Sequence, residues 1–187
     1  MKTTLRFLLL IGASFFIWWS LTISNNKNGT SSPQSNQPYI EFFMNDFHIT
    51  SLDSTGKAQY TLTGSHVEQY NNSNKAMVTL PVFNFLDVDN QWLITADKAT
   101  INKKKNIIKL SDHVVMQQQN KPLAIKVTSD VMFLNTQKQT AYTKTPVTIK
   151  QGSSEMNSIG MSYFNLESKL VLKSRVRGFY FNNHSAK

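Results

Sequence analysis

The sequence contains no cysteine, and this absence removes several kinds of chemistry at once. Without a thiol there is no disulfide, no thiolate ligand for a metal, no thiol nucleophile and no cysteine that could carry a lipid. Glycine is also scarce, at 7 of 187 residues. The chain has neither a glycine-rich phosphate loop nor a serine flanked by glycines at a nucleophile elbow. These absences weigh against catalysis.

Histidine is equally sparse. The four histidines are His48, His66, His113 and His184, and no two of them have the i, i+4 spacing of a helical metal site. Isolated histidines on expected strands are more often ordinary strand residues than metal ligands or general bases. We therefore expect no metal site, no cofactor and no enzymatic activity.

Acidic residues are few compared with basic ones, 11 against 20, which gives a formal net charge of +9. Such a charge attracts polyanions, among them nucleic acid, anionic lipid headgroups and phosphorylated glycolipids, and does not choose between them. The run Lys103–Lys105 could hold phosphate, although a basic run between two strands is more often a solvated turn.

A long hydrophobic run occurs once, at residues 7–23. As a helix it would rise about 25 Å, near the short end of what spans a bilayer core of about 30 Å. Two basic residues precede the run, no small-residue cleavage site follows it, and Trp18 and Trp19 suit a membrane interface. We expect residues 1–24 to be a cytoplasmic N-terminus and single transmembrane helix rather than a cleaved signal peptide.

Residues 25–38 are rich in serine, asparagine and glutamine and lack large apolar side chains, so they are expected to form a flexible linker. Residues 39–187 should form one β domain, because apolar and polar residues alternate between clusters of turn-forming residues. The expected strands are Tyr39–Thr50, Ala58–Gln69, Lys75–Leu86, Trp92–Ile101, Ile107–Gln117, Leu123–Leu134, Gln139–Lys150, Glu155–Asn165 and Leu170–Phe181.

A repeat runs through this domain. Gly64, Ala96, Ser129 and Gly160 lie 32, 33 and 31 residues apart. A set of valines follows them at similar intervals: Val82, Val114, Val147 and Val176. The period leaves no room for a helix, so it indicates one strand–turn–strand unit stacked about four times. The class is all-β and antiparallel, as in sandwiches and jelly rolls.

One face of the early strands is unusually apolar. We predict that an apolar groove is lined by Phe47, Ile49, Val78, Leu80, Phe83 and Phe85. Pro81 interrupts this run and cannot donate to a β ladder, so it indicates an edge or bulge where the inward-facing residues change parity. A closed sandwich core is the simpler interpretation. The alternative is an open groove whose free edges join partners by strand addition.

Five segments resemble the LptC family of lipopolysaccharide export proteins. They are GSHVEQY at 64–70, LPVF at 80–83, WLITADKA at 92–99, LSDHV at 110–114 and SRVRGFY at 174–180, all behind one N-terminal anchor. The resemblance covers essentially the whole chain and is weakest over residues 138–154. It implies an open, twisted antiparallel β jelly roll in the periplasm, held to the inner membrane by one transmembrane helix.

The family resemblance also implies partners. The chain would pass lipopolysaccharide from the ATP-driven LptBFG transporter to the periplasmic bridge protein LptA, with jelly rolls joined edge to edge and no nucleic acid involved. Expected interface residues are Phe42, Met44, Gly152, Val176, Gly178 and Tyr180. Two alternatives stay open, a membrane-anchored β-rich adaptor that binds only proteins and an extracytoplasmic glycan- or lipid-modifying enzyme.

Overall fold

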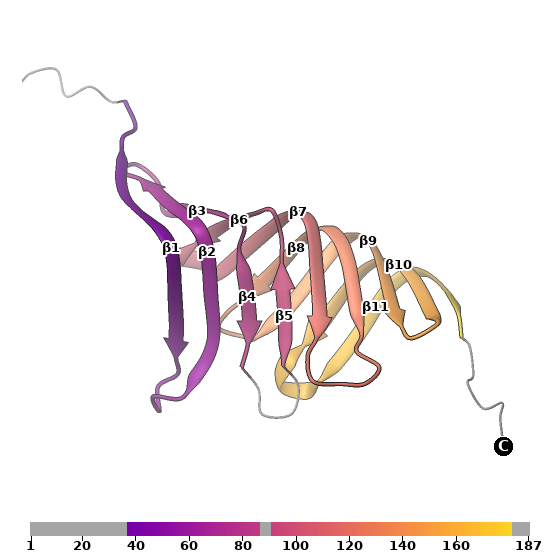
Figure 1. Cartoon of the computed structure of the whole chain (residues 1–187). Helices are drawn as coiled ribbons and strands as arrows, with labels where there is room; N and C mark the ends of the chain where they lie inside the picture. Colours follow the sequence, from indigo (N-terminus) through magenta and orange to yellow (C-terminus); the bar gives the residue numbers. More distant parts are fainter. Residues whose placement is uncertain (1–36, 87–90, 181–187) are drawn as a thin grey trace, which may run out of the picture. The chain divides into compact units, whose positions relative to one another are not determined.

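Antiparallel strands make up most of the part of the chain that the structure, a computed structural model, describes: residues 37–86 and 91–180 (Figure 1). The elements are β1 (Ile40–Leu52), β2 (Ala58–Tyr70), β3 (Lys75–Thr79), β4 (Val82–Phe85), β5 (Trp92–Thr95), β6 (Lys98–Asn102), η1 (Lys103–Lys105), β7 (Ile107–Gln118), β8 (Lys126–Asn135), β9 (Thr140–Gln151), β10 (Ser154–Phe164), η2 (Asn165–Glu167) and β11 (Lys169–Phe179). The prediction of an all-β antiparallel domain is confirmed.

The expected anchor at residues 7–23 and the linker up to residue 36 lie outside the described residues. Within the described ranges, no helix is both long enough and apolar enough to cross a membrane. The structure therefore bears on the β domain alone.

The eleven strands form one sheet that is folded over on itself. The later part of β2 pairs with β3, whereas its earlier part pairs with β4. In the same way the first half of β7 pairs with β6 and its second half with β5. The sheet thus has two layers joined along a corner. We call the layer that contains β3 and β6 the first layer and the layer that contains β4 and β5 the second layer.

The corner is made by irregular backbone at the same level in successive strands. Asp46, Leu80, Asp112 and Arg175 have positive φ values, and ladder register shifts accompany the bends in β7, β8 and β10. Such bulges bend a strand and reverse which residues face inward. The expected long strand at residues 75–86 is accordingly two strands, β3 and β4, which meet at Leu80 and Pro81.

The sequence repeat corresponds to this corner. Gly64, Ala96, Ser129 and Gly160 each lie where a strand, or a pair of short strands, passes from one layer to the other. At Gly64 a Cβ atom would come within 2.8 Å of Val78 Cγ1 and 2.9 Å of Phe47 Cε1. Because Gly64 has no side chain, Val78 and Phe47 can approach each other on the inside of the corner.

Among the strands that the structure describes, only β1 and β11 have a partner on a single side, which is β2 for β1 and β10 for β11. All other strands in the described part of the chain have neighbours on both sides. Figure 1 shows β1 at one end of the stack, with the chain leaving β11 at the other. Each end therefore presents an unpaired backbone edge.

Candidate functional site

An uninterrupted row of apolar side chains crosses the inner face of the second layer, one from each of eight strands. Residues directly opposite each other in a ladder point to the same face, and the register links each member of the row to the next. We call this row the apolar file. Its members are Ile49, Leu62, Phe83, Ile94, Met116, Val127, Ile149 and Met156.

The file is buried along its middle and exposed at its ends. The six residues between Ile49 and Met156 are 0–2% exposed, whereas each of those two terminal residues is 39% exposed. A continuous row of packed apolar side chains therefore runs the length of the sheet, and its two ends meet solvent at the β1 edge and at the β11 edge.

The first layer covers the apolar file with a second row of apolar side chains. Val67, Val78, Ala99, Leu110 and Met132 are in register across β2, β3, β6, β7 and β8, and each is at most 4% exposed. Aromatic rings add contacts inside. Phe83 stacks on Tyr60, with centroids 4.9 Å apart, and meets Phe85 edge to face at 4.8 Å.

One aromatic contact joins the two layers directly. Trp92 of the second layer packs against Tyr163 of the first, with ring centroids 4.8 Å apart. Trp92 is 2% exposed, and its indole Nε1 is buried without a hydrogen-bond partner. An indole N–H buried in this way carries a desolvation cost that a bound acceptor could remove.

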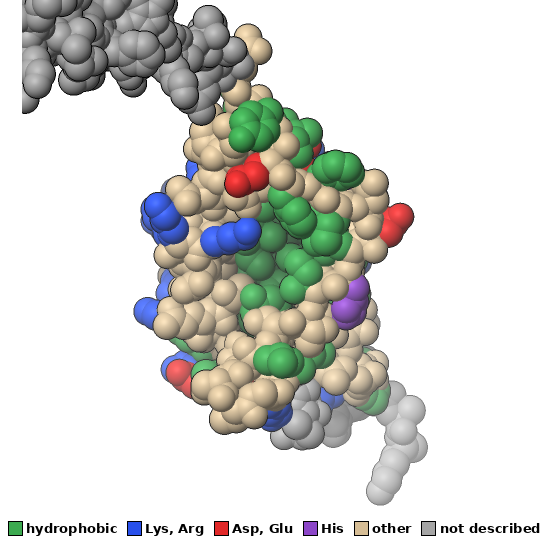
Figure 2. Space-filling model, turned by 90° about the vertical axis from the view of Figure 1, so that its left-hand side faces the viewer, with side chains coloured by type: hydrophobic (Ala, Val, Ile, Leu, Met, Phe, Trp, Pro, Cys, Tyr) green, Lys and Arg blue, Asp and Glu red, His purple; other side chains and the backbone are tan. Residues whose placement is uncertain are grey.

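The β1 end of the interior is open to solvent. Phe42, Met44 and Ile49 stand on the inner face of β1, because they pair with Gln69, Val67 and Leu62 of β2. Phe42 is 42% exposed although it faces inward. Figure 2 shows hydrophobic side chains gathered around a hollow at this end, with basic side chains along one side.

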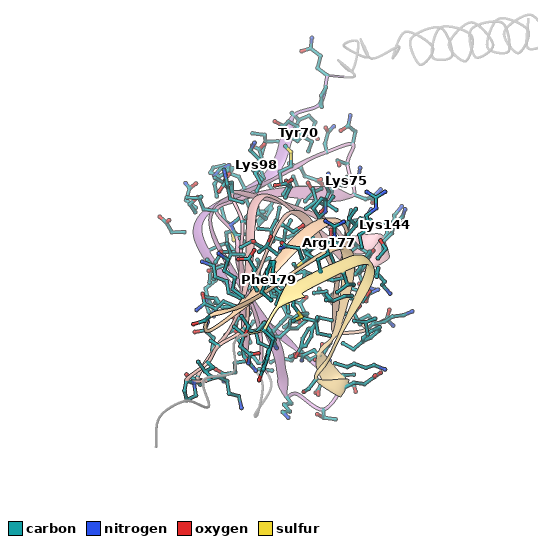
Figure 3. The ribbon with its side chains drawn as sticks, turned by 90° about the vertical axis from the view of Figure 1, so that its right-hand side faces the viewer. Tyr70, Lys75, Lys98, Lys144, Arg177 and Phe179 are labelled. Atoms are coloured by element: carbon teal, nitrogen blue, oxygen red, sulfur yellow. The ribbon has the colours of Figure 1, made fainter. Side chains whose placement is uncertain are left out.

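The β11 end carries a second opening. A hollow of about 270 Å³ lies there, lined by Ile149, Gln151, Ser154, Met156, Gly178, Phe179 and Tyr180. A Cβ atom at Gly178 would come within 2.8 Å of Met156 Cγ, so the glycine keeps this end clear. Figure 3 views the molecule from this side, with Arg177 and Phe179 on the last strand.

The structure brings together five of the six predicted groove residues. Phe47, Val78, Phe83 and Phe85 are buried inside, and Ile49 stands at the open end. Leu80 does not lie with them: it is 57% exposed at the corner, where its φ of 48° separates β3 from β4. Placing it on the inner face neglected the bend that Pro81 itself indicated.

The predicted interface residues lie at the two ends of the sheet. Phe42 and Met44 are on edge strand β1, and Val176, Gly178 and Tyr180 are on or just after edge strand β11. Gly152, with a φ of 57°, forms the turn between β9 and β10. The sequence analysis did not predict the later members of the apolar file, which are Met116, Val127, Ile149 and Met156. The alternation of apolar and polar residues over residues 114–156 could have identified them.

Two contacts between oppositely charged or titratable side chains lie on the outside of the corner. His113 Nδ1 lies 2.7 Å from an oxygen of Asp97, and Lys98 Nζ lies 3.2 Å from Asp112. A hollow of about 380 Å³ beside His113 is lined in part by Asp130 and is separate from the apolar file. Among the described residues, no three histidine or carboxylate side chains are close enough to hold a metal ion.

The hydrogen bond from His113 to Asp97, together with the negative charge of that carboxylate, raises the pKa of His113. We expect Asp97→Asn to lower the pKa of His113 toward its ordinary value of about 6.5. A raised folded-state pKa means that the pair stabilises the fold below the unfolded-state pKa, and that this contribution is lost as pH rises through the folded value.

NMR titration of the His113 ring protons checks this prediction. Asp53→Asn, a carboxylate substitution in the β1–β2 turn, serves as the control and should leave His113 unchanged. An unaltered His113 titration in Asp97→Asn would show that the contact does not persist in solution.

Comparison with known proteins finds a matching family and similar solved structures. A family model for lipopolysaccharide-assembly proteins related to LptC matches residues 7–181. Among solved structures, the chain is similar to LptH of Pseudomonas aeruginosa, the LptA-homologous periplasmic component of a lipopolysaccharide transport device. The TM-score is 0.51 at 9% identity, over 66% of this chain and 95% of that one, a likeness that concerns the fold alone. The search of curated proteins found no match.

Proposed function

The chain belongs to the LptC family and so has a role in lipopolysaccharide transport, and we propose that it acts as a membrane-anchored bridge that passes lipopolysaccharide along its apolar interior. In this proposal residues 7–23 hold it in the inner membrane, with the N-terminus in the cytoplasm and the β domain in the periplasm. It is a carrier and a scaffold, not an enzyme.

The observation that carries the proposal is the apolar file, buried in the middle and exposed at both ends. Burial of apolar surface stabilises an acyl chain by about 0.8 kcal/mol per methylene. Exposing a chain of about 12 carbons to water would therefore cost a free energy on the order of 9 kcal/mol. A path lined throughout by apolar side chains avoids that cost while the sugar and phosphate groups stay in water.

In this proposal the lipid must be driven into the interior. The interior side chains are packed against one another, and Trp92 of the second layer contacts Tyr163 of the first. An acyl chain can enter only by separating such contacts. In this proposal the energy comes from an ATP-using transporter of the LptBFG type.

The free edges supply the connections to other proteins. Main-chain donors and acceptors on an edge strand are suited to strand addition by a neighbouring sheet. We assign the β1 edge, which follows the proposed linker, to the transporter, and the β11 edge to an LptA-type bridge protein. A β-rich adaptor that binds only proteins would use the same edges without carrying lipid, and the next experiment separates the two.

We expect a photo-crosslinking amino acid at Ile49 or Met156 of the full chain to capture lipopolysaccharide when transporter and ATP are present. These are the exposed ends of the apolar file. The matched controls are Thr50 and Asn157, each one residue further along the same strand and therefore on the outer face. The adducts are measured by immunoblotting for lipopolysaccharide, with an expected excess of at least about fivefold at the inner positions.

Equal capture at inner and outer positions would mean that the lipid contacts the surface and does not pass through the interior. Absence of capture at both inner positions, with protein partners still bound, would favour the adaptor.

A further inference from the structure

Four hairpin turns of the first layer lie side by side along its free margin, opposite the corner. The pairs Lys75–Asn102, Asn102–Ile107, Ile107–Asn135, Asn135–Thr140, Thr140–Phe164 and Phe164–Lys169 form one continuous row across the sheet. The turns that follow or precede this row are 71–74, 103–106, 136–139 and 165–168. We call residues 71–75, 103–106, 136–139 and 165–169 the basic lip.

The basic lip concentrates positive charge. Its lysines are Lys75, Lys103, Lys104, Lys105, Lys138 and Lys169, all exposed, and Glu167 is its single carboxylate. Within the described residues, no carboxylate lies within 4.0 Å of these six ammonium groups. Among the described residues, no carboxylate therefore pairs with these ammonium groups.

The three lysines at 103–105 are held in a defined turn. They form η1, in which the Asn102 side chain accepts a hydrogen bond from the backbone N–H of Lys105 at 3.1 Å and Asn106 adopts a left-handed conformation. Lys103 Nζ donates to Gln69 Oε1 at 2.9 Å, which links η1 to β2. The turn presents its ammonium groups from a fixed backbone.

The opposite margin has a different character. Counted in the same way, with the first residue of the strand that follows each turn, the described turns of the second layer are 53–58, 119–126 and 151–154, and their charged residues are Asp53, Lys57, Lys121 and Lys126. Charge is therefore unequal between the two sides of the interior, and the asymmetry cannot be explained by the overall basic composition of the chain.

A hollow connects the basic lip to the apolar interior. It has a volume of about 180 Å³ and is lined by Tyr60, Ile101, Asn102, Lys103, Asn106, Ile107, Ile108 and Thr136. Tyr60 comes from the second layer and stacks on Phe83 of the apolar file. A molecule at this point would meet ammonium groups and buried apolar side chains within one site.

We infer that the basic lip binds the phosphate groups of the lipopolysaccharide headgroup while the acyl chains enter between the layers. This inference rests on the proposed function. An ammonium group pairs with phosphate as a point charge, and several together discriminate a phosphorylated amphiphile from a neutral one. The lip would fix which side of the carried lipid faces the first layer.

The test compares two triple variants of the full chain, held in an amphipathic polymer without detergent. The first variant is Lys103→Gln, Lys104→Gln, Lys105→Gln in the basic lip. The matched control, Lys57→Gln, Lys121→Gln, Lys126→Gln, removes the same charge from the second layer and its margin. Equilibrium binding is measured for lipopolysaccharide, for the same material after phosphatase treatment, and for phosphatidylglycerol vesicles.

We expect the lip variant to bind lipopolysaccharide about tenfold more weakly than the parent chain at low salt. The control variant should bind within about twofold of the parent. After phosphatase treatment of the lipopolysaccharide, the two variants should bind it equally. Equal weakening in both variants would reduce the effect to net charge and overturn the inference. So would an unchanged lip variant, an undiminished difference after phosphatase treatment, or a loss of vesicle binding as large as the loss of lipopolysaccharide binding. Failure of the parent chain to bind lipopolysaccharide at all would instead contradict the proposed function.

Discussion

Replacing Phe83 with alanine is expected to lower the free energy of unfolding by about 3–5 kcal/mol, the usual cost of deleting a buried phenyl ring. Phe83 is fully buried at the middle of the apolar file and contacts the rings of Tyr60 and Phe85. Its removal would leave a cavity that neighbours in two adjacent strands cannot fill without moving backbone. Denaturant unfolding followed by tryptophan fluorescence measures the change.

Phe43→Ala is the matched control. Phe43 stands on edge strand β1, is 60% exposed and contacts His66 at a centroid distance of 6.2 Å. Its substitution should cost less than about 1 kcal/mol. If Phe83→Ala were no more destabilising than this control, the interior would not be the packed core described above.

The second large effect concerns the β11 edge. Val176→Pro is expected to weaken binding of the periplasmic bridge protein at least about tenfold while leaving transporter binding intact. Val176 is 51% exposed on a strand that pairs only with β10. Proline removes a backbone donor and fixes φ near −65°, so it disturbs the β11 edge and leaves the distant β1 edge unchanged. Pull-down of both partners with the full chain measures the two contacts together.

Phe43→Pro at the β1 edge gives the reciprocal control, because it should weaken transporter binding and spare the bridge protein. Circular dichroism establishes that each variant is folded. Two folded variants that retain both partners would exclude strand addition at these edges as the means of assembly.

Local pattern in the sequence was sufficient for most of the strands, although the expected strands at residues 75–86 and 92–101 are each observed as two. The strand predicted at Ala58–Gln69 is observed as Ala58–Tyr70, and the one at Ile107–Gln117 as Ile107–Gln118. Alternation of apolar and polar residues reports which side of a strand is buried, and that information is local. The repeat through Gly64 and Gly160 was equally readable, since each unit must bend at the same level to keep one face inside.

Backbone bends were harder to place. Pro81 indicated an irregularity, yet Leu80 was assigned to the inner face and is exposed at the corner with a positive φ. Alternation cannot locate the single residue at which parity changes, because a shift of one position reverses every side chain beyond it.

The sequence by itself determined the all-β class, most strand limits and the apolar inner face of the early strands. Only the tertiary structure decided that eight strands contribute to one file, and that Lys75, Lys103–Lys105, Lys138 and Lys169 share one margin. In the sequence these lysines belong to separate turns. Antiparallel pairing brings alternate turns to the same margin of the sheet, and the register of that pairing depends on contacts between residues far apart in the chain.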